Sequence, residues 1–204
     1  MAVALTLQTC QYCRVSELSP GGQRLLDVAT RVFYAEGIRA TGVDTLVALA
    51  GVSKPTLYAQ FGSKENLVAA VLDRRRASRQ AALHDFLDEK RAAPPAGRLL
   101  AVFDWLAQGH GREGFRGCPF TNAAVELPDP GHPARAVISA YKGALRDTLT
   151  GLAREAGLAE PEDLGYALLM LIDGANARVV VDGDRTAILK AKAAAARMIG
   201  HTDG

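Results

Sequence analysis

The stretch that decides the fold is TGVDTLVALAGVSKPTLYAQF, residues 41–61. An apolar helical segment runs up to Ala50 and stops at Gly51, which adopts the left-handed conformation of a tight turn at low steric cost. A second short helix follows, with Lys54, Thr56 and Gln60 among its polar residues. Two short helices joined by a glycine turn form the frame that presents a helix to the major groove of DNA.

The polar and apolar positions of this stretch indicate where its two helices begin and which residues face the core. Thr41 is a plausible N-cap of the first helix, and Ser53 is the N-cap of the second. Pro55 lies in the first helical turn, where its missing N–H does no harm. Leu57 and Phe61 are four residues apart and therefore face the core together. The other positions of the second helix remain free to face outward.

Helical periodicity continues on both sides of this stretch. One helix is expected from Pro20 to about Glu36, closed by Gly37, and a long one follows the Ser63 cap to about Lys90. Further helices are expected over residues 96–109, 120–126, 134–156, 161–182 and 184–199, and no substantial β pattern is present. The sequence therefore predicts an all-α protein of about nine helices. The helix over 161–182 is hydrophobic on more than one face, which indicates packing against a large body or a partner chain.

Composition and charge narrow the class of protein. The chain has 204 residues, 49% hydrophobic and 23% charged, which is ordinary for a soluble protein. No apolar run reaches the length of a membrane helix, and the first residues lack the basic start of a secretion signal, so a cytoplasmic protein is expected. Residues 20–79 hold nine basic and five acidic side chains, whereas the remainder from residue 80 is mildly acidic. A basic first third fits a nucleic-acid-binding head, although an excess of this size is weak evidence alone.

The order of these elements, together with specific motifs between Arg24 and Leu72, resembles the TetR family of bacterial one-component transcriptional regulators. The matching features are Gly37, Thr41, AGVSK at 50–54, TLY at 56–58, Phe61 and SKE at 63–65. Small departures at Gly42, Val47 and Pro55 leave the frame intact. The segment GCPFTNAAVELPDPGHPAR, residues 117–135, is similar to a segment of multidrug- or metabolite-responsive members.

The resemblance implies a homodimeric, all-helical repressor without a cofactor. Its helix-turn-helix heads bind a palindromic operator in double-stranded DNA, its last two helices dimerise as a four-helix bundle, and a small hydrophobic effector in the body weakens DNA binding. The implied organisation is a tail at 1–19, a three-helix DNA-binding domain at 20–66 with the motif at 42–61, and a helical ligand-binding and dimerisation domain at 67–204.

Candidate DNA contacts divide into those that position the protein on phosphates and those that read base edges. Lys64, Tyr58, Thr41 and Thr45 are candidates for phosphates, and Lys54, Thr56 and Gln60 for base edges. Arg39 can reach the backbone or the minor groove. The alternatives are that Thr41, Ser53 and Ser63 are only helix caps, that Tyr58 is core, and that Arg74–Arg76 form a solvated face rather than an electrostatic support.

The effector site is expected between helices of the body, where apolar side chains mix with a few polar ones. The candidates are Phe103, Trp105, Phe120, Asn122, Tyr141, Met170 and Asn176. Each can also be simple core. Asp173, Asn176 and Arg178 can instead form a polar network at the dimer seam.

Catalysis and metal binding find little support in the sequence. Three cysteines imply no disulfide framework, the pair Cys10 and Cys13 has no second pair to complete a zinc site, and the four histidines are scattered. Cys118 is expected to be a packed cysteine, although a redox sensor or the nucleophile of a helical enzyme is an alternative. A DNA-binding regulator without a ligand is a further alternative, and a cavity in the body would argue against it.

Overall fold

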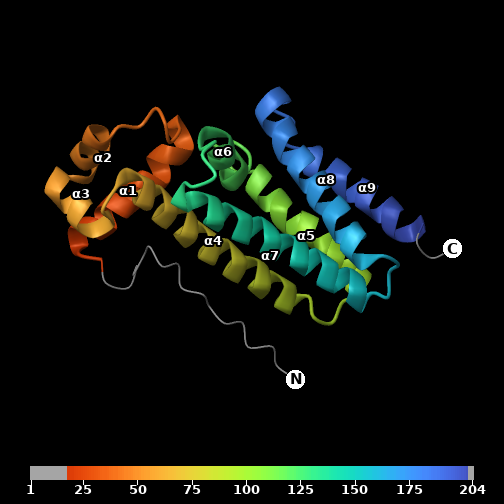
Figure 1. Ribbon diagram of the computed structural model, residues 1–204. Helices are drawn as coiled ribbons and strands as arrows, with labels where there is room; N and C mark the ends of the chain where they lie inside the picture. Colours follow the sequence, from red (N-terminus) through yellow and green to blue (C-terminus); the bar gives the residue numbers. More distant parts are fainter. Residues whose placement is uncertain (1–17, 202–204) are drawn as a thin grey trace, which may run out of the picture. The chain divides into compact units, whose positions relative to one another are not determined.

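The computed structural model describes residues 18–201, and within them all regular structure is α-helical (Figure 1). The helices are α1 (Pro20–Glu36), α2 (Val43–Ala50), α3 (Lys54–Phe61), α4 (Lys64–Glu89), α5 (Pro95–His110), α6 (Pro119–Glu126), α7 (Pro133–Glu155), α8 (Pro161–Asp182) and α9 (Ala187–His201). The predicted all-α fold is confirmed. Cys10, Cys13 and nearly all of the expected tail lie outside the described residues.

The described chain divides into two compact units. The head comprises residues 18–75 and 126–137, and the body comprises residues 76–125 and 138–201. The helices α4, α6 and α7 each contribute residues to both. Every helix of the helix-turn-helix frame therefore belongs to the head.

The turns of the head follow from single residues. Gly51 adopts φ 60° and ψ 42°, the left-handed conformation that lets the chain turn from α2 into α3. The side chain of Ser53 accepts a hydrogen bond from the backbone N–H of Thr56, so Ser53 caps α3 as predicted. Thr41 is not the cap of α2, because Gly42 occupies that position. The Thr41 hydroxyl instead donates to the carbonyl of Gly37 at 2.7 Å.

A compact apolar core holds the head together. Leu25 and Leu26 of α1, Leu46 of α2 and Leu57 of α3 are fully buried, and Phe61 is 6% exposed. The segment of α4 from Leu67 to Leu72 is buried as well. Because α3 contributes only Leu57 and Phe61 to this core, the rest of its surface stays available.

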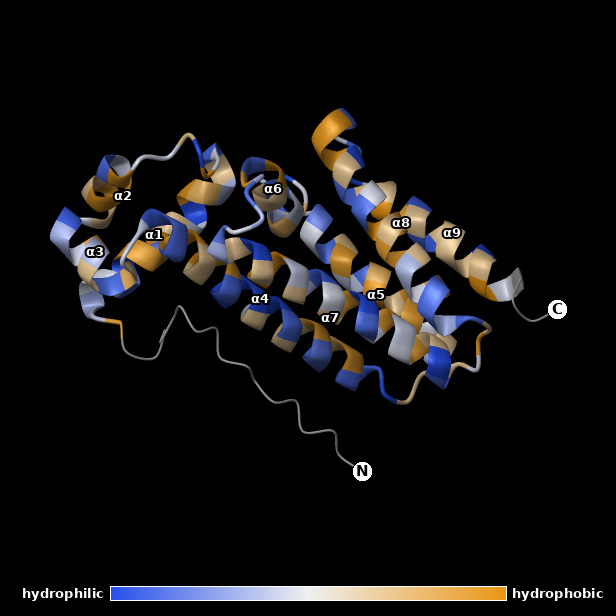
Figure 2. Ribbon diagram, in the orientation of Figure 1, coloured by the Kyte–Doolittle hydropathy of each residue, from blue (hydrophilic) through white to orange (hydrophobic). Residues whose placement is uncertain are grey.

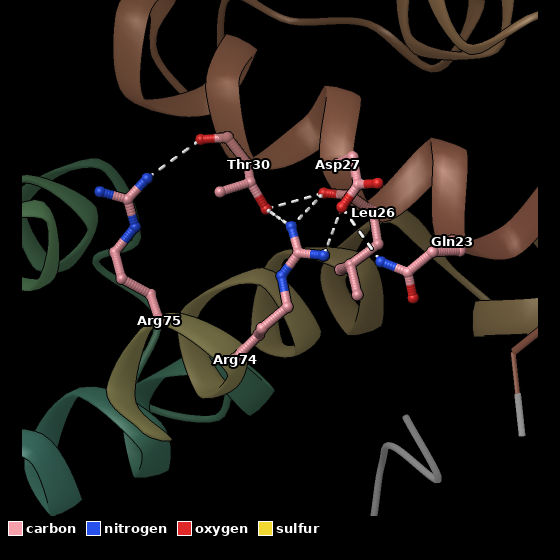
Figure 3. Close-up of polar contacts among 6 residues, drawn as sticks. All are labelled: Gln23, Leu26, Asp27, Thr30, Arg74 and Arg75. Atoms are coloured by element: carbon pink, nitrogen blue, oxygen red, sulfur yellow. Dashed lines mark hydrogen bonds and ion pairs between the residues drawn. The ribbon is translucent and has the colours of Figure 1, made fainter. Parts of the chain in front are cut away.

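Two arginines of α4 fasten this helix to α1 (Figure 3). Arg74 donates to Asp27 Oδ1 at 2.6 Å, to the Leu26 carbonyl at 3.1 Å and to the Thr30 hydroxyl. Arg75 donates to the Thr30 carbonyl at 3.1 Å, and its guanidinium lies 4.9 Å from the centre of the Tyr34 ring. Arg74 and Arg75 therefore form neither a solvated face nor an electrostatic support for DNA binding, since both side chains bind groups of α1.

The body is built around the broad apolar surface of α8. Leu168 and Ile172 of α8, Leu99 and Phe103 of α5 and Ile188 of α9 belong to one buried cluster. The helix α9 packs against both α5 and α8. By length and composition alone α8 could cross a membrane, with a mean hydropathy of 1.4, but here it is a helix of the packed body.

A close approach of two backbones joins α7 to α8. A Cβ atom added to Gly165 would lie 2.1 Å from Thr150 Oγ1 and 3.0 Å from the Thr150 backbone nitrogen. Only a residue without a side chain fits there. Gly151, also in α7, has open space where its Cβ would be.

The first prediction uses these two glycines. We expect Gly165→Ala to lower the free energy of unfolding by about 1–3 kcal/mol, because the methyl group overlaps backbone atoms that cannot move away cheaply. Gly151→Ala should instead raise it by up to about 1 kcal/mol, since alanine is the better helix former. Urea unfolding followed by circular dichroism measures both. Equal effects of the two substitutions would contradict the close approach.

The second prediction concerns the arginine link between α1 and α4. We expect Arg74→Ala to destabilise the head by about 1–2 kcal/mol, because three hydrogen bonds from a charged group are lost at a partly exposed site. Arg91→Ala is the matched control, since Arg91 forms an exposed ion pair with Asp88 and such pairs contribute little to stability. Hydrogen exchange of α1 amides locates the loss. Protection of α1 that is unchanged in Arg74→Ala would show that the link is not stabilising.

Candidate functional site

The exposed surface of α2 and α3 contains the first candidate site. Thr45 and Lys54 are exposed, Tyr58 is 50% exposed, and Leu49 is 58% exposed. The alternative that Tyr58 is a core residue is therefore wrong. An aromatic ring and two polar side chains on adjoining short helices suit contact with a polar, charged surface.

An ion pair holds Lys54 in place. Its Nζ lies 2.7 Å from Asp44 Oδ1 at the start of α2. The hydrogen bond to Asp44 raises the pKa of Lys54. The ion pair links α2 to α3 on the solvent side, and it has to loosen or rearrange if Lys54 contacts a base.

The two other candidates for base contacts are partly used inside the head. Gln60 Oε1 accepts a hydrogen bond from the Ser19 backbone N–H at 2.8 Å, which ties the end of α3 to the start of α1. The Thr56 hydroxyl lies 3.0 Å from that of Ser53, and Thr56 as a residue is half-buried. These two contacts use Gln60 Oε1 and the Thr56 hydroxyl, and they leave the amide nitrogen of Gln60 and the methyl group of Thr56 for other contacts.

Lys64 and Arg39 lie near the loop between α1 and α2. Lys64 Nζ donates to the Ile38 carbonyl at 2.7 Å and lies 6.0 Å from the centre of the Phe33 ring. The backbone N–H of Arg39 donates to Glu126 Oε2 at 2.9 Å, while its side chain is exposed. Thr41 lies apart from the surface because it is only 1% exposed.

The N-terminus of α4 already holds polar partners. The Ser63 side chain accepts from the Asn66 backbone N–H at 3.1 Å. The backbone N–H of Glu65 bonds its own carboxylate, and this bond lowers the pKa of Glu65. Both groups reduce the number of free N–H donors that a phosphate would find at this helix end.

The body contains a narrow internal cavity, which is the second candidate site. It offers about 20 Å³ to a water-sized sphere and is lined by apolar residues such as Leu106, Leu145 and Ile172 together with a few polar ones. The polar lining comes from Arg79, His110, Cys118, Tyr141, Lys142 and Asn176. A mostly apolar cavity with a few polar groups is the usual composition of a small-molecule site.

His110 and Asn176 form a buried polar pair at this cavity. His110 is 1% exposed and Asn176 is 8% exposed. Asn176 Nδ2 donates to the Ile172 carbonyl at 3.0 Å, so Asn176 Oδ1 faces His110 Nε2 at 3.2 Å. His110 Nδ1 is buried and has no hydrogen-bond partner. Burial lowers the pKa of His110, which keeps the ring neutral at pH 7.

Tyr141 is the second polar centre of the cavity. Its hydroxyl accepts a hydrogen bond from Arg79 Nε at 3.0 Å, and its ring stacks on Phe120 at 3.8 Å. Burial raises the pKa of Tyr141, so the phenol stays protonated. The Arg79 guanidinium also lies 4.6 Å from the centre of the Trp105 ring.

The seven predicted effector residues are not brought together at one cavity. Tyr141 and Asn176 line it, Phe120 and Trp105 contact its lining residues, and Phe103 is fully buried in the main core. Asn122 Nδ2 donates to the Arg116 carbonyl. Met170 is 56% exposed and lies on the solvent side of α8.

The residues considered for a polar network at a dimer seam have separate partners within the chain. Asp173 pairs with Lys142, Asn176 bonds His110, and Arg178 pairs with Asp182 at 3.1 Å. Between residues 18 and 201 no group of three or more His, Cys, Asp and Glu side chains could hold a metal. Cys118 is 8% exposed and unpaired at the cavity wall.

Sequence reasoning did not single out His110 and Arg79. His110 ends α5, at the edge of an apolar pattern, where a lone histidine gives no motif. Arg79 follows the arginine cluster of α4 in sequence. The one sequence signal that could have indicated His110 and Arg79 was their position on the same helices as predicted core residues.

Comparison with known proteins assigns both parts of the chain. Residues 25–71 match the family model described as bacterial regulatory proteins of the tetR family. Residues 95–195 match the model described as a tetracyclin repressor-like C-terminal domain. Together these matches cover most of the chain.

Two curated relatives have opposite regulatory outputs. The HTH-type transcriptional activator FasR of Mycolicibacterium smegmatis is 32% identical over 168 residues, covering 79% of this chain and 73% of FasR. The HTH-type transcriptional repressor ComR of Escherichia coli is 46% identical over 68 residues, which is 32% of each chain.

Solved structures match over nearly the whole chain. A TetR-family transcriptional regulator from Streptomyces coelicolor has a TM-score of 0.79 and 32% identity, covering 90% of this chain and 96% of its own. A putative regulator from Streptomyces avermitilis has a TM-score of 0.79 and 31% identity, covering 89% and 98%. The family consists of regulators rather than enzymes, and the chain belongs to the TetR family of DNA-binding transcriptional regulators.

Proposed function

We propose that the chain is a homodimeric repressor in the cytoplasm that leaves a palindromic operator when a small hydrophobic effector binds in its body. The observation that carries this proposal is the exposed face of α2 and α3, where Thr45, Lys54 and Tyr58 stand free of the head core. Repression requires only that the bound protein blocks a promoter, so it is the simplest outcome of tight operator binding. Because FasR is an activator, repression has to be tested directly. Expression of a reporter gene placed behind the operator shows whether the protein represses or activates transcription.

The proposed DNA contacts follow from exposure and charge. Lys54 is proposed to read a base edge from α3, and Tyr58, Thr45 and Arg39 are proposed to contact the sugar–phosphate backbone. For Thr56, Gln60, Lys64 and Thr41 a direct contact requires their present hydrogen bonds to rearrange. In the proposed organisation residues 20–66 bind DNA and residues 67–204 bind the effector and dimerise.

The proposed dimer surface is the solvent side of α8 and α9. Figure 2 shows hydrophobic residues along much of α8, and Tyr166, Met170 and Val180 are all more than half exposed. A shallow groove beside Met170 is lined by small residues, including Gly174 and Ala191. Exposed apolar side chains beside small ones favour a close helix-to-helix contact with a second copy.

The third prediction tests DNA binding with DNA fragments from the regions flanking the gene. We expect Lys54→Ala to weaken binding to the preferred fragment by about 1–3 kcal/mol and to reduce the preference for that fragment over unrelated DNA, because one base contact is lost. Lys90→Ala removes one charge from the body and should change neither quantity. Fluorescence anisotropy over a range of salt, with unrelated competitor DNA, measures both. Wild-type protein that prefers none of the flanking fragments over unrelated DNA would contradict the proposal.

A second variant separates the contact of Lys54 from its ion pair. Asp44→Asn removes a negative charge from the exposed side of α2 and frees Lys54. We expect this variant to bind DNA more tightly than wild type, since phosphate repulsion falls and Lys54 need not leave a partner. Weaker binding would show that Asp44 positions Lys54 for the contact.

The fourth prediction tests the dimer. We expect Met170→Glu to shift the protein from a dimer to a monomer in sedimentation and to weaken operator binding at least tenfold, because a charge would be buried without a partner. Val125→Glu is the matched control at a residue that is 78% exposed in α6, and it should leave the dimer intact. A monomeric wild-type protein, or a dimeric Met170→Glu variant, would rule out this surface.

A further inference from the structure

The lining of the body cavity defines a specific hydrogen-bonding requirement. Asn176 Nδ2 donates to the Ile172 carbonyl, so the amide oxygen of Asn176 is the atom that faces His110. His110 Nε2 must then carry the proton of this hydrogen bond, because Asn176 Oδ1 can only accept. In a neutral ring the other nitrogen, Nδ1, is left as an acceptor.

This acceptor is unsatisfied within the protein. His110 Nδ1 is buried without a hydrogen-bond partner, and the ring is covered on one side by Phe115, whose centre lies 4.6 Å away. Unpaired buried polar atoms are uncommon in folded proteins because they lose their contact with water. His110 lines the cavity, so a group in the cavity that reaches this nitrogen would pair it by supplying a hydrogen-bond donor.

Tyr141 supplies the complementary group. Its hydroxyl oxygen accepts from Arg79 Nε, and its own proton has no acceptor among the described residues. An acceptor on His110 and a donor on Tyr141 thus line one cavity. A hydroxyl group is both donor and acceptor, and one group of that kind matches both residues.

The remaining lining limits the charge and polarity of the ligand. Leu106, Leu145 and Ile172 give apolar walls, and Lys142 is paired with Asp173. The free volume of about 20 Å³ accommodates one water-sized group such as a hydroxyl. A larger ligand has to displace lining side chains.

We propose that the effector is an apolar compound with a hydroxyl group, which donates its proton to His110 Nδ1 and accepts one from the Tyr141 hydroxyl. This inference rests on the ligand response proposed above and specifies its chemistry. The apolar part of the effector lies against the aliphatic walls. A ligand that offers only an acceptor, such as an ether, leaves His110 unpaired and binds less tightly.

The test compares two probes of nearly the same shape, phenol and anisole, by isothermal titration calorimetry with the full-length protein. Anisole keeps the ring and the oxygen of phenol but lacks the O–H donor. We expect phenol to bind about tenfold more tightly than anisole, because anisole leaves a buried acceptor unpaired. Equal binding of the two probes, or tighter binding of anisole, would overturn the inference. Binding of neither probe would overturn it as well, because a water molecule would then be the partner of His110 Nδ1.

Three variants test whether His110 causes the preference for phenol and whether the probes bind beside Tyr141. His110→Phe keeps the ring contact with Phe115 and should reduce the binding of phenol to the level of anisole. Tyr141→Phe removes a donor that both probes use, so it should weaken both while the ratio stays near tenfold. His84→Phe, at an exposed histidine of α4, should leave the ratio unchanged. A preference for phenol that persists in His110→Phe overturns the inference. If His110→Phe fails to fold, Tyr141→Phe still decides whether the probes occupy this cavity.

Anisotropy of the protein–DNA complex separates this inference from the proposed function. Binding of phenol through His110 without release of DNA supports the site and contradicts the proposed ligand response. Release of DNA by other apolar compounds, with phenol and anisole bound alike, overturns the site and leaves the ligand response intact.

Discussion

The head depends on one constraint, which is that α3 has only eight residues and cannot be stable alone. The helix is held by what surrounds it. Leu57 and Phe61 bury its inner face, the left-handed turn at Gly51 fixes its direction, and Gln60 bonds the backbone at Ser19. Each contact fixes one end or one face, so the outer face is presented in a defined orientation. Orientation is what base recognition requires, since hydrogen bonds to base edges tolerate little displacement.

The polar residues on this surface have two roles that compete. Lys54 pairs with Asp44, and Lys64 donates to the Ile38 carbonyl, so both cations have a partner within the head when no DNA is bound. The Lys54 pair is exposed and contributes little to stability. The Lys64 contact is partly buried and supports the loop before α2. Lys54 can therefore turn to DNA at a lower cost than Lys64, although both occupy matching positions of the family motif.

Local sequence signals predicted the helices well because each signal acts within one turn. Gly51, Ser53 and the apolar spacing around Leu57 determine their own neighbourhoods, and the structure agrees with them. Thr41 was harder to place because a threonine before a helix can either cap it or bond back to the preceding turn, and here its hydroxyl reaches Gly37. Other contacts join residues that lie far apart in the sequence. Arg74 and Asp27 are 47 positions apart, and no periodicity indicates which surface partner a long side chain will choose.

In the body, the buried polar residues indicate function more clearly than the apolar ones. His110 and Asn176 are 66 positions apart and meet inside an otherwise apolar region. A pair of apolar side chains of the same shape would be nearly neutral or stabilising there, and the unpaired Nδ1 of His110 makes the polar pair costlier still. A buried polar pair that stability does not require is best explained by recognition. Its cost is recovered only when a donor occupies the cavity, so a ligand with a donor stabilises the bound state of the body selectively.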